Sequence, residues 1–419
     1  MINCLASYID PGTGSMLFTL VIGLLSAGYF VLRSLIVKLK FIASGGRAGS
    51  RSSERMDYVI FSDHKRYWNV FEPICDEFER RGIEATFWTA SPDDPALKKP
   101  YQHVKCAFIG EGNKAFAKLN LMSAVICLST TPGLDVYQWK RSKEVGWYVH
   151  TFHTVGTAVG YRMFGMDFYD AVLLAGEFQR DEIREIESLR GIPAKELEMV
   201  GCTYLDSMAK RLETEGAQNK LTPERNLRVL LAPSWGPNGI LSVYGERIID
   251  AILDTGFDLA IRPHPQSQTA DRKILDALMT KYPNGGRVSW NYDNDNFAIL
   301  DWADVMITDF SGVIFDYTLV FDKPVIYTEA NYDTALYDAA WLESPQWRFE
   351  VYPTLGVPLD ESQFSQMREV IKCVVASKNL RRGRDRAREE AWAYPMEGAC
   401  RTVDYLVRKH DELVASQEA

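Results

Sequence analysis

The chain has 419 residues, of which 46% are hydrophobic and 25% charged, so it is long enough for about two to three domains with sizeable cores. Its formal net charge of −9 argues against a nucleic-acid-binding protein, which usually carries a basic balance. The seven cysteines form no CxxC pair and no Cys/His cluster, so they indicate reduced thiols and no metal site.

The first apolar segment follows a short N-terminal tail, residues 1–13. The stretch 14–37 is long enough to span a bilayer as a helix if Arg33 extends toward the head groups. Basic residues follow this stretch and none precedes it, so the positive-inside rule predicts a single-pass anchor with the N-terminus outside. A helix lying in the membrane interface is the alternative. A cleaved signal peptide fits less well because its positive charges would come first.

Residues 38–56 are rich in Gly, Ser and Arg and predict a flexible basic linker. From residue 57, short apolar runs alternate with amphipathic stretches, which is typical of a parallel sheet with helical crossovers. Helices are expected over Trp68–Arg81 and Phe178–Arg190, each followed by a glycine. The strands expected in this part are Tyr58–Ser62, Ala85–Trp88, Cys106–Ile109, Ala124–Leu128, Trp147–Phe152 and Ala171–Leu174.

A polar stretch, Thr214–Arg225, interrupts the alternation and predicts a boundary between two Rossmann-like domains, 57–215 and 216–400. Residues 401–419 are expected to form a C-terminal helix and tail. Two such α/β domains face a cleft, and ligands bind there beyond the carboxyl ends of the strands. The strands expected in the second domain are Leu227–Ala232, Phe257–Ile261, Arg287–Trp290, Asp304–Ile307 and Pro324–Tyr327, with helices near 246–253, near 270–281 and from Ser311.

The segment after the predicted strand 304–307 is the richest in candidate binding residues. Asp309 follows the strand, Ser311 is expected to cap a helix, and Gly312 is expected at the first helical position. Such a helix start presents backbone N–H groups that suit a phosphate. Asp316 lies about one and a half turns further on. An ordinary capped helix with a solvated aspartate is the structural alternative.

Three further segments place polar side chains at predicted strand ends. Arg262 and His264 belong to an Arg-Pro-His-Pro sequence, where both side chains can bind phosphate oxygens, although a rigid strand exit would look the same. Ser234 follows a strand and can also bond a phosphate. His153 precedes a loop with Gly and Thr and is a candidate general base, with a purely structural histidine as the alternative. His150 is the weaker candidate because it falls within the strand.

In this order, the four segments resemble the CDP-glycerol glycerophosphotransferases, the teichoic-acid primases and polymerases of bacterial envelopes. DFSGVIFDY at 309–317 is similar to the family's aspartate–aromatic–Ser-Ser…Phe-Asp-Tyr segment, with Gly312 in place of the second serine. HTVGT at 153–157 is similar to the family's His-Gly-Thr, with two residues inserted. The resemblance covers about residues 57–410.

The resemblance implies two Rossmann-like domains of the glycosyltransferase B type. It implies a CDP-linked donor, CDP-glycerol or a related CDP-alditol, whose pyrophosphate would be held by His264, Ser311 and Gly312, and no further cofactor. His153 would take a proton from the acceptor hydroxyl. The expected partners are a polyprenyl- or glycan-linked acceptor in the membrane and membrane lipids, and the expected location is the bacterial cell membrane with the catalytic part in the cytoplasm.

Two other functions stay open from the sequence. The first is a glycosyltransferase with a nucleotide-sugar donor, because one fold can serve both reactions. The second is a non-catalytic membrane scaffold, for which the altered loop after His153 is the argument. The nucleotide that is released or bound distinguishes the three.

Overall fold

The computed structural model describes residues 28, 55–215, 225–293, 295–328 and 333–418. The predicted tail 1–13, the predicted anchor 14–37 except Gly28, and the linker up to residue 54 lie outside this range. No helix within the described ranges is long and apolar enough to cross a membrane. Met56–Ala419 forms one compact unit, and the fold described below is that of this unit.

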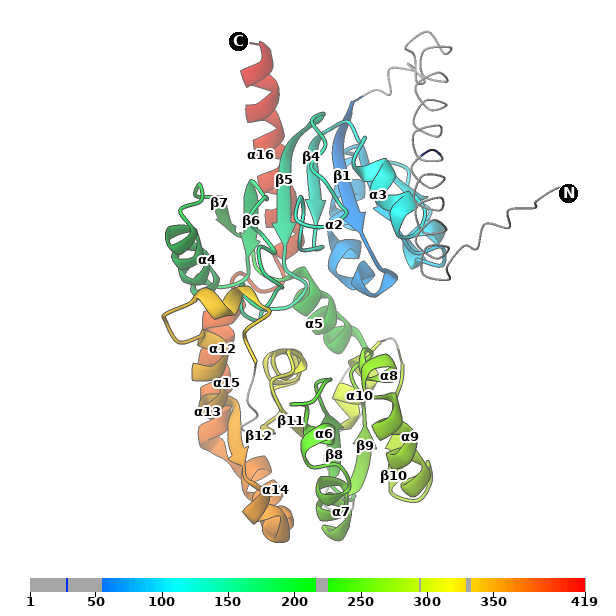
Figure 1. The fold of residues 1–419 in the computed structure, drawn as a ribbon, viewed down its shortest axis with the longest axis vertical. Coiled ribbons are helices and arrows are strands. Elements are labelled where there is room, and N and C mark those ends of the chain that lie inside the picture. The colour runs from blue at the N-terminus through cyan, green and yellow to red at the C-terminus, as the bar shows by residue number, and fades with distance from the viewer. Residues whose placement is uncertain (1–27, 29–54, 216–224, 294, 329–332, 419) are drawn as a thin grey trace, which may run out of the picture. The chain divides into compact units, whose positions relative to one another are not determined.

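The first half of this unit is a parallel sheet of seven strands in the order β3-β2-β1-β4-β5-β6-β7 (Figure 1). Side chains of β1 alternate between two cores: Ile60 packs with Phe71 of α2 on one face, and Phe61 packs with Leu119 of α3 on the other. The strands are therefore apolar on both faces, as in other covered parallel sheets. Their bounds are β1 Met56–Ser62, β2 Ala85–Thr89, β3 Val104–Phe108, β4 Ala124–Ser129, β5 Val145–Thr151, β6 Ala171–Leu174 and β7 Glu196–Met199.

The helices of the first half are amphipathic, and two of them end at glycines in the left-handed conformation. Gly82 after α2 has φ 67° and Gly191 after α4 has φ 61°, a backbone geometry that only glycine adopts without strain. The bounds are α2 Trp68–Arg81, α3 Asn113–Leu119, α4 Glu177–Arg190, α5 Thr203–Glu215 and the C-terminal α16 Gly398–Glu418, with 3₁₀ turns Lys65–Tyr67 and Pro95–Lys98.

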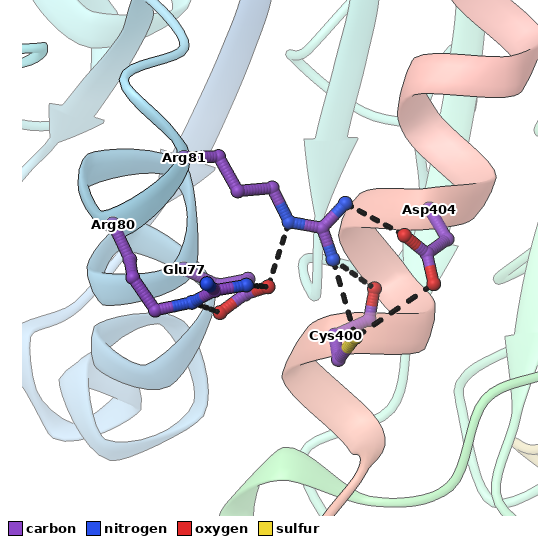
Figure 2. A network of polar contacts seen from close by, with 5 residues as sticks. All are labelled: Glu77, Arg80, Arg81, Cys400 and Asp404. Carbon is purple, nitrogen blue, oxygen red and sulfur yellow. Dashed lines mark hydrogen bonds and ion pairs between the residues drawn. The ribbon is translucent and has the colours of Figure 1, made fainter.

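The last helix, α16, packs against α2, α5 and β4, so the chain returns to the first half at its C-terminus (Figure 1). Figure 2 shows the polar contacts that join α16 to α2. The Arg81 guanidinium donates to the carboxylate of Glu77 at 2.7 Å and to that of Asp404 at 2.6 Å. It also donates to the Cys400 carbonyl at 3.3 Å.

The second half is a parallel sheet of six strands in the order β10-β9-β8-β11-β12-β13. Its strands are β8 Arg228–Ala232, β9 Asp258–Ile261, β10 Val288–Trp290, β11 Val305–Thr308, β12 Val325–Thr328 and β13 Gly356–Leu359. Its helices are α6 Ile240–Val243, α7 Glu246–Asp254, α8 Ser267–Ala270, α9 Arg272–Lys281, α10 Phe297–Trp302, α11 Val313–Phe315, α12 Trp347–Glu350, α13 Tyr352–Leu355, α14 Met367–Ala376 and α15 Lys378–Ala391, with 3₁₀ turns Asp338–Trp341 and Glu361–Gln366.

A segment of the second half, residues 334–342, crosses to the first half after β12. Its backbone pairs with the loop after β5, where the Asp338 N–H donates to the Tyr161 carbonyl at 2.9 Å. The Asp338 carboxylate accepts from the backbone N–H groups of Phe164 at 2.7 Å and Gly165 at 3.0 Å, and from the buried guanidinium of Arg190. This contact fixes the loop that follows the candidate base.

The strands predicted from the sequence are all present, with ends shifted by at most two residues. Two edge strands were not predicted. β7 is short and carries two glutamates, and β13 contains Pro358, which a sheet tolerates at its edge. Both lack the continuous apolar run by which the central strands are recognised.

The predicted helix start at Ser311 is wrong. The N-cap is Gly312, without a side-chain cap, and α11 continues after three residues as a π-helical turn, Asp316–Val320. Within that turn the Thr318 hydroxyl donates to the Ile314 carbonyl at 2.7 Å, a bond that competes with regular helix geometry. Asp316 therefore begins the π-helical turn.

Candidate active site

A cavity of about 370 Å³ lies between the two halves, at the carboxyl ends of β5, β8, β9 and β11. Residues 66, 67, 69, 70, 153, 154 and 204 line it from the first half. Residues 232–233, 262–265, 295–296, 311–313 and 316 line it from the second. Six of the eight residues predicted from the sequence are therefore brought together here: His153, Arg262, His264, Ser311, Gly312 and Asp316.

Arg262 follows β9 and is partly buried in the wall of the cavity. Its guanidinium donates to the Asn291 side chain, and to the Asp293 carbonyl at 2.8 Å. Both acceptors are amide oxygens, so they orient the cation without neutralising it. Burial lowers the pKa of Arg262, but an arginine stays protonated at neutral pH. The residue can thus offer a fixed positive charge to an anionic ligand.

His264 lies two residues further along the loop that follows β9. Its Nδ1 accepts from the backbone N–H of Gln266 at 3.2 Å, which leaves the proton of a neutral ring on Nε2. Burial, and secondly the charge of Arg66, lower the pKa of His264 to about 4. At neutral pH this side chain is therefore an uncharged donor at the cavity surface.

Gly312 and Asp316 belong to the segment after β11. A Cβ atom added at Gly312 would meet no atom closer than Thr154 Oγ1 at 4.0 Å, on the opposite wall, so a side chain there would extend into the cavity. Asp316 is buried, and burial raises its pKa to about 7, with Asn296 and Tyr204 as hydrogen-bonding neighbours that lower it. Its Oδ1 has no partner among the described residues.

Asp309 and Ser234 are not among the residues that line the cavity. The Asp309 carboxylate is buried and accepts from the backbone N–H of Ser234 at 2.9 Å and of Ile240 at 2.9 Å. The Ser234 N–H also lies 3.0 Å from the second oxygen of this carboxylate. The pair holds the loop after β8 to the loop after β11, and thereby positions two parts of the cavity wall.

His153 lies two residues beyond the end of β5, on the wall of the first half. Its Nδ1 lies 3.2 Å from the Thr130 hydroxyl, and its ring packs on Tyr67 with centroids 4.9 Å apart. Burial, and secondly Arg66, lower the pKa of His153 to about 4. The imidazole is therefore neutral at pH 7, the protonation state that a general base requires.

The lining residues that were not predicted include Arg66, Tyr67, Tyr204 and Asn296. Arg66 and Tyr67 precede helix α2, next to the carboxyl end of β1, and this position could have drawn attention to them. Tyr204 and Asn296 come from separate elements and meet only in the fold, where the Tyr204 hydroxyl donates to Asn296 Oδ1 at 3.1 Å. No local sequence signal marks that pair.

Residues 222–343 match the model of a family described as CDP-Glycerol:Poly(glycerophosphate) glycerophosphotransferase. This part of the chain is glycerophosphotransferase-like. The match covers the segments that contain Arg262, His264 and Asp309–Asp316, and it confirms the expectation of a glycerophosphotransferase-like enzyme. A comparison with curated proteins gives no match.

Solved structures share the fold of the chain. Two structures of the wall teichoic acid polymerase TagF are 12% identical, with TM-scores of 0.53 and 0.56. The match with the first structure spans 94% of this chain and 99% of the polymerase chain. The match with the second spans 92% of this chain and 98% of the polymerase chain. The UDP-GlcNAc 2-epimerase of Methanocaldococcus jannaschii is also 12% identical, with a TM-score of 0.51 over 84% of this chain and 100% of its own. The expected glycosyltransferase B type of fold, with two parallel-sheet α/β domains, is thereby confirmed.

Proposed function

We propose that the chain transfers glycerol phosphate, or a related alditol phosphate, from a CDP-linked donor to a hydroxyl of a membrane-linked acceptor. The product would belong to a teichoic-acid-like, capsule or other envelope polymer. One observation carries the proposal: a neutral histidine on the first half faces, across one cavity, an arginine, a second histidine and a glycine-containing helix start on the second half. The family match over residues 222–343 supports it.

In this proposal the donor pyrophosphate lies against the second half. Arg262 supplies charge, His264 supplies an Nε2–H donor, and Ser311 and Gly312 supply the hydroxyl and the open backbone. These groups would stabilise the negative charge that builds up on the phosphoryl oxygens during transfer. Ser234 and Asp309 act indirectly, by fixing the loops that carry the wall.

The chemical step is an in-line displacement at the β-phosphorus. The acceptor oxygen forms a bond to this phosphorus while the bond to the bridging oxygen of the pyrophosphate breaks, and CMP leaves with the bond's electron pair. The proton of the acceptor hydroxyl passes to the neutral ring of His153. Holding both substrates in one cavity makes the reaction effectively unimolecular, which is a large part of the rate enhancement.

We further propose that residues 14–37 anchor the chain in the bacterial cell membrane, with residues 38–56 as a basic linker and the catalytic part in the cytoplasm. The apolar stretch, which has no charge over residues 16–32, and the basic residues that follow it support this. In that arrangement a polyprenyl- or glycan-linked acceptor would reach the cavity from the membrane surface. The domain bounds 57–215, 216–400 and 401–419 belong to the same proposal.

The test is to incubate the purified full chain in detergent with CDP-glycerol, CDP-ribitol, UDP-sugars and GDP-sugars, and to identify the nucleotide that is released. CMP from a CDP-alditol is the expected result. Release of UDP or GDP would assign the chain to the sugar-transferring reaction. Release of none, together with no thermal stabilisation by any of these donors, would assign it to a non-catalytic scaffold, because a bound ligand raises apparent stability.

A further inference from the structure

The loop that follows His153 contains two threonines, Thr154 and Thr157, whose hydroxyl groups differ in their surroundings. The Thr157 hydroxyl donates to the Glu182 carboxylate of α4 at 2.8 Å. The Thr154 hydroxyl oxygen is buried and has no hydrogen-bond partner among the described residues. Thr154 lines the cavity, whereas Thr157 is not among the lining residues. The transfer step assigned to His153 and His264 does not involve Thr154.

The loop that carries Thr154 is held on both sides. On one side, the Gly156 carbonyl accepts from Nε2 of the buried Gln179 of α4 at 2.9 Å. On the other side, Val155 is fully buried in a core cluster that also contains Phe315 of the second half. The backbone next to Thr154 is therefore fixed, and its side chain is held at the surface of the cavity.

Gly312 of the second half lies opposite Thr154. A Cβ atom on Gly312 would have Thr154 Oγ1 as its contact, at 4.0 Å. A ligand oxygen that lies over the Gly312 backbone is therefore within reach of a hydrogen bond from the Thr154 hydroxyl. His153 directly precedes Thr154 and lines the same cavity, so the proposed base and this hydroxyl are neighbours on one wall.

The unpartnered hydroxyl of Thr154 suits an anionic ligand. A buried hydroxyl without a partner lowers stability, so its presence in the cavity wall calls for an explanation. A phosphoryl oxygen is an acceptor, to which a hydroxyl can donate, and hydrogen bonds to charged groups are stronger than those between neutral groups. In the proposed function, the group between His153 and Gly312 is the β-phosphoryl group, because the acceptor oxygen attacks its phosphorus.

We propose that Thr154 is a further catalytic residue, whose hydroxyl donates a hydrogen bond to an oxygen of the β-phosphoryl group of the nucleotide-linked donor. The identity of the donor in this inference rests on the proposed function. Thr154 keeps its proton throughout and stabilises the charge of the phosphoryl group during transfer. The first half thus binds the group that Arg262 and His264 bind from the second half. The bound donor is the missing partner of the hydroxyl.

The test compares the binding of CDP and CMP to the full chain in detergent, because only CDP has a β-phosphoryl group. The wild type is expected to bind CDP more tightly than CMP in calorimetric titrations. Thr154→Val replaces the hydroxyl by a methyl group, so its affinity for CDP is expected to fall roughly 10- to 100-fold, with the affinity for CMP unchanged. Thr154→Ser keeps the hydroxyl and is expected to retain tight binding of CDP. With CDP-glycerol as donor, kcat/KM for CMP release is expected to fall by a similar factor in Thr154→Val.

Two other threonines provide matched controls. Thr402 of α16 also has a buried hydroxyl without a partner in the described part of the chain, and it is not among the cavity-lining residues. Thr402→Val is expected to leave CDP binding unchanged. Thr157→Val loses the bond to Glu182, so its Tm is expected to fall. Thr154→Val loses no hydrogen bond of the free protein, so its Tm is expected to equal or exceed that of the wild type.

The outcomes separate this inference from the proposed function. Unchanged affinity for CDP in Thr154→Val, an equal loss for CDP and CMP, or a fall in Tm as large as that of Thr157→Val would overturn the role of Thr154 and leave the proposed function standing. The same titrations are made with UDP and UMP, and with GDP and GMP. A loss that depends on Thr154 for UDP or GDP but not for CDP would support the inference and overturn the CDP-linked donor. A wild type that binds none of the three diphosphates would overturn both.

Discussion

At the scale of single residues, the chemistry proposed for the cavity depends on histidines that are kept uncharged. His153 lies on the first half and His264 on the second, and both line the same cavity. Burial is the first cause of the lowered pKa of each histidine, and the charge of Arg66 is the second. Neutral rings do not repel the arginines of the site, and each can fill a distinct role. One offers a lone pair and the other an N–H donor.

The lowered pKa of His153 predicts the pH dependence of transfer. The base is active in its neutral form, so the acidic limb of kcat/KM is expected below pH 6.5, the ordinary value for histidine. Arg66→Gln removes one of the two causes, and the limb is expected to move upward, toward 6.5. Arg180→Gln removes a charge from the exposed surface of α4 and is the control. A wild-type limb at or above 6.5, or one that Arg66→Gln does not move, would contradict this account of the site.

The raised pKa of Asp316 predicts how the stability of the fold depends on pH. Its pKa is raised to about 7 in the folded chain, above its ordinary value, so it stabilises the fold least when the pH is high enough to ionise it. Asp316→Asn stays uncharged at every pH. The variant is therefore expected to gain stability over the wild type as the pH rises from 4 to 8, by an amount on the order of a few kcal/mol. Thermal unfolding of both proteins at the two pH values measures the difference in stability. A difference that does not grow with pH would contradict the raised pKa of Asp316.

Several binding residues of the second half could be predicted from the sequence, because they follow predicted strands and have Pro or Gly as neighbours. Arg262, His264 and Ser311 are of this kind, and the structure places them in the wall of the cavity. The role of Asp309 could not be predicted, because its carboxylate turns toward backbone N–H groups that lie 69 and 75 residues away. The same holds for the hydrogen bond from the Asp338 N–H to the Tyr161 carbonyl, which depends on how two distant loops pack.

At the scale of elements, the cavity is built at the ends of parallel strands, and the loops that leave them must be held. The Asp309 carboxylate does this for the loops after β8 and β11. Central strands were predicted closely because they are continuous apolar runs, whereas the edge strands β7 and β13 and the π-helical turn depend on tertiary contacts. In that turn the Thr318 hydroxyl donates to the Ile314 carbonyl, and no periodicity in the sequence predicts the turn.

Removing the Asp309 carboxylate is expected to loosen the cavity wall. Asp309→Ala leaves the buried N–H groups of Ser234 and Ile240 without acceptors, at a cost of roughly 2–6 kcal/mol in the free energy of unfolding. Asp309→Asn keeps one acceptor oxygen and the side-chain volume, so its loss should be smaller. Urea denaturation monitored by fluorescence gives both values. If the alanine variant were as stable as the wild type, the structural role assigned to Asp309 would be wrong.

At the scale of the whole molecule, both halves contribute to one site, and two segments of chain connect them. Helix α16 returns from the second half to pack on the first. The segment 334–342 also crosses from the second half to the first, where it is hydrogen-bonded to the loop that follows His153. The sequence indicated two halves, but it gave no sign of either return, because the contacts join residues more than 150 positions apart.

The crossing segment predicts a coupling between stability and catalysis. Asp338→Ala takes one of two carboxylate partners from the buried Arg190, so the free energy of unfolding is expected to fall by roughly 3–5 kcal/mol. It also releases the N–H groups of Phe164 and Gly165, so kcat should fall although no cavity residue has changed. Asp333→Asn, at the exposed residue just before this segment, is the control. A stable Asp338→Ala protein with wild-type kcat would show that the contact does not support the site.

The central claim is that an alditol phosphate is transferred in the cavity between the halves. His153 acts as the base, and His264 donates a hydrogen bond to the pyrophosphate of the CDP-linked donor. The most direct measurement follows CMP and phosphodiester formation together, in the full-length wild type and in His153→Gln and His264→Gln. The account predicts equal amounts of the two products, with kcat lowered about 10²- to 10⁴-fold in His153→Gln at unchanged donor affinity. It predicts weaker donor binding in His264→Gln. Undiminished transfer in both variants, or phosphodiester formation without CMP, would contradict it.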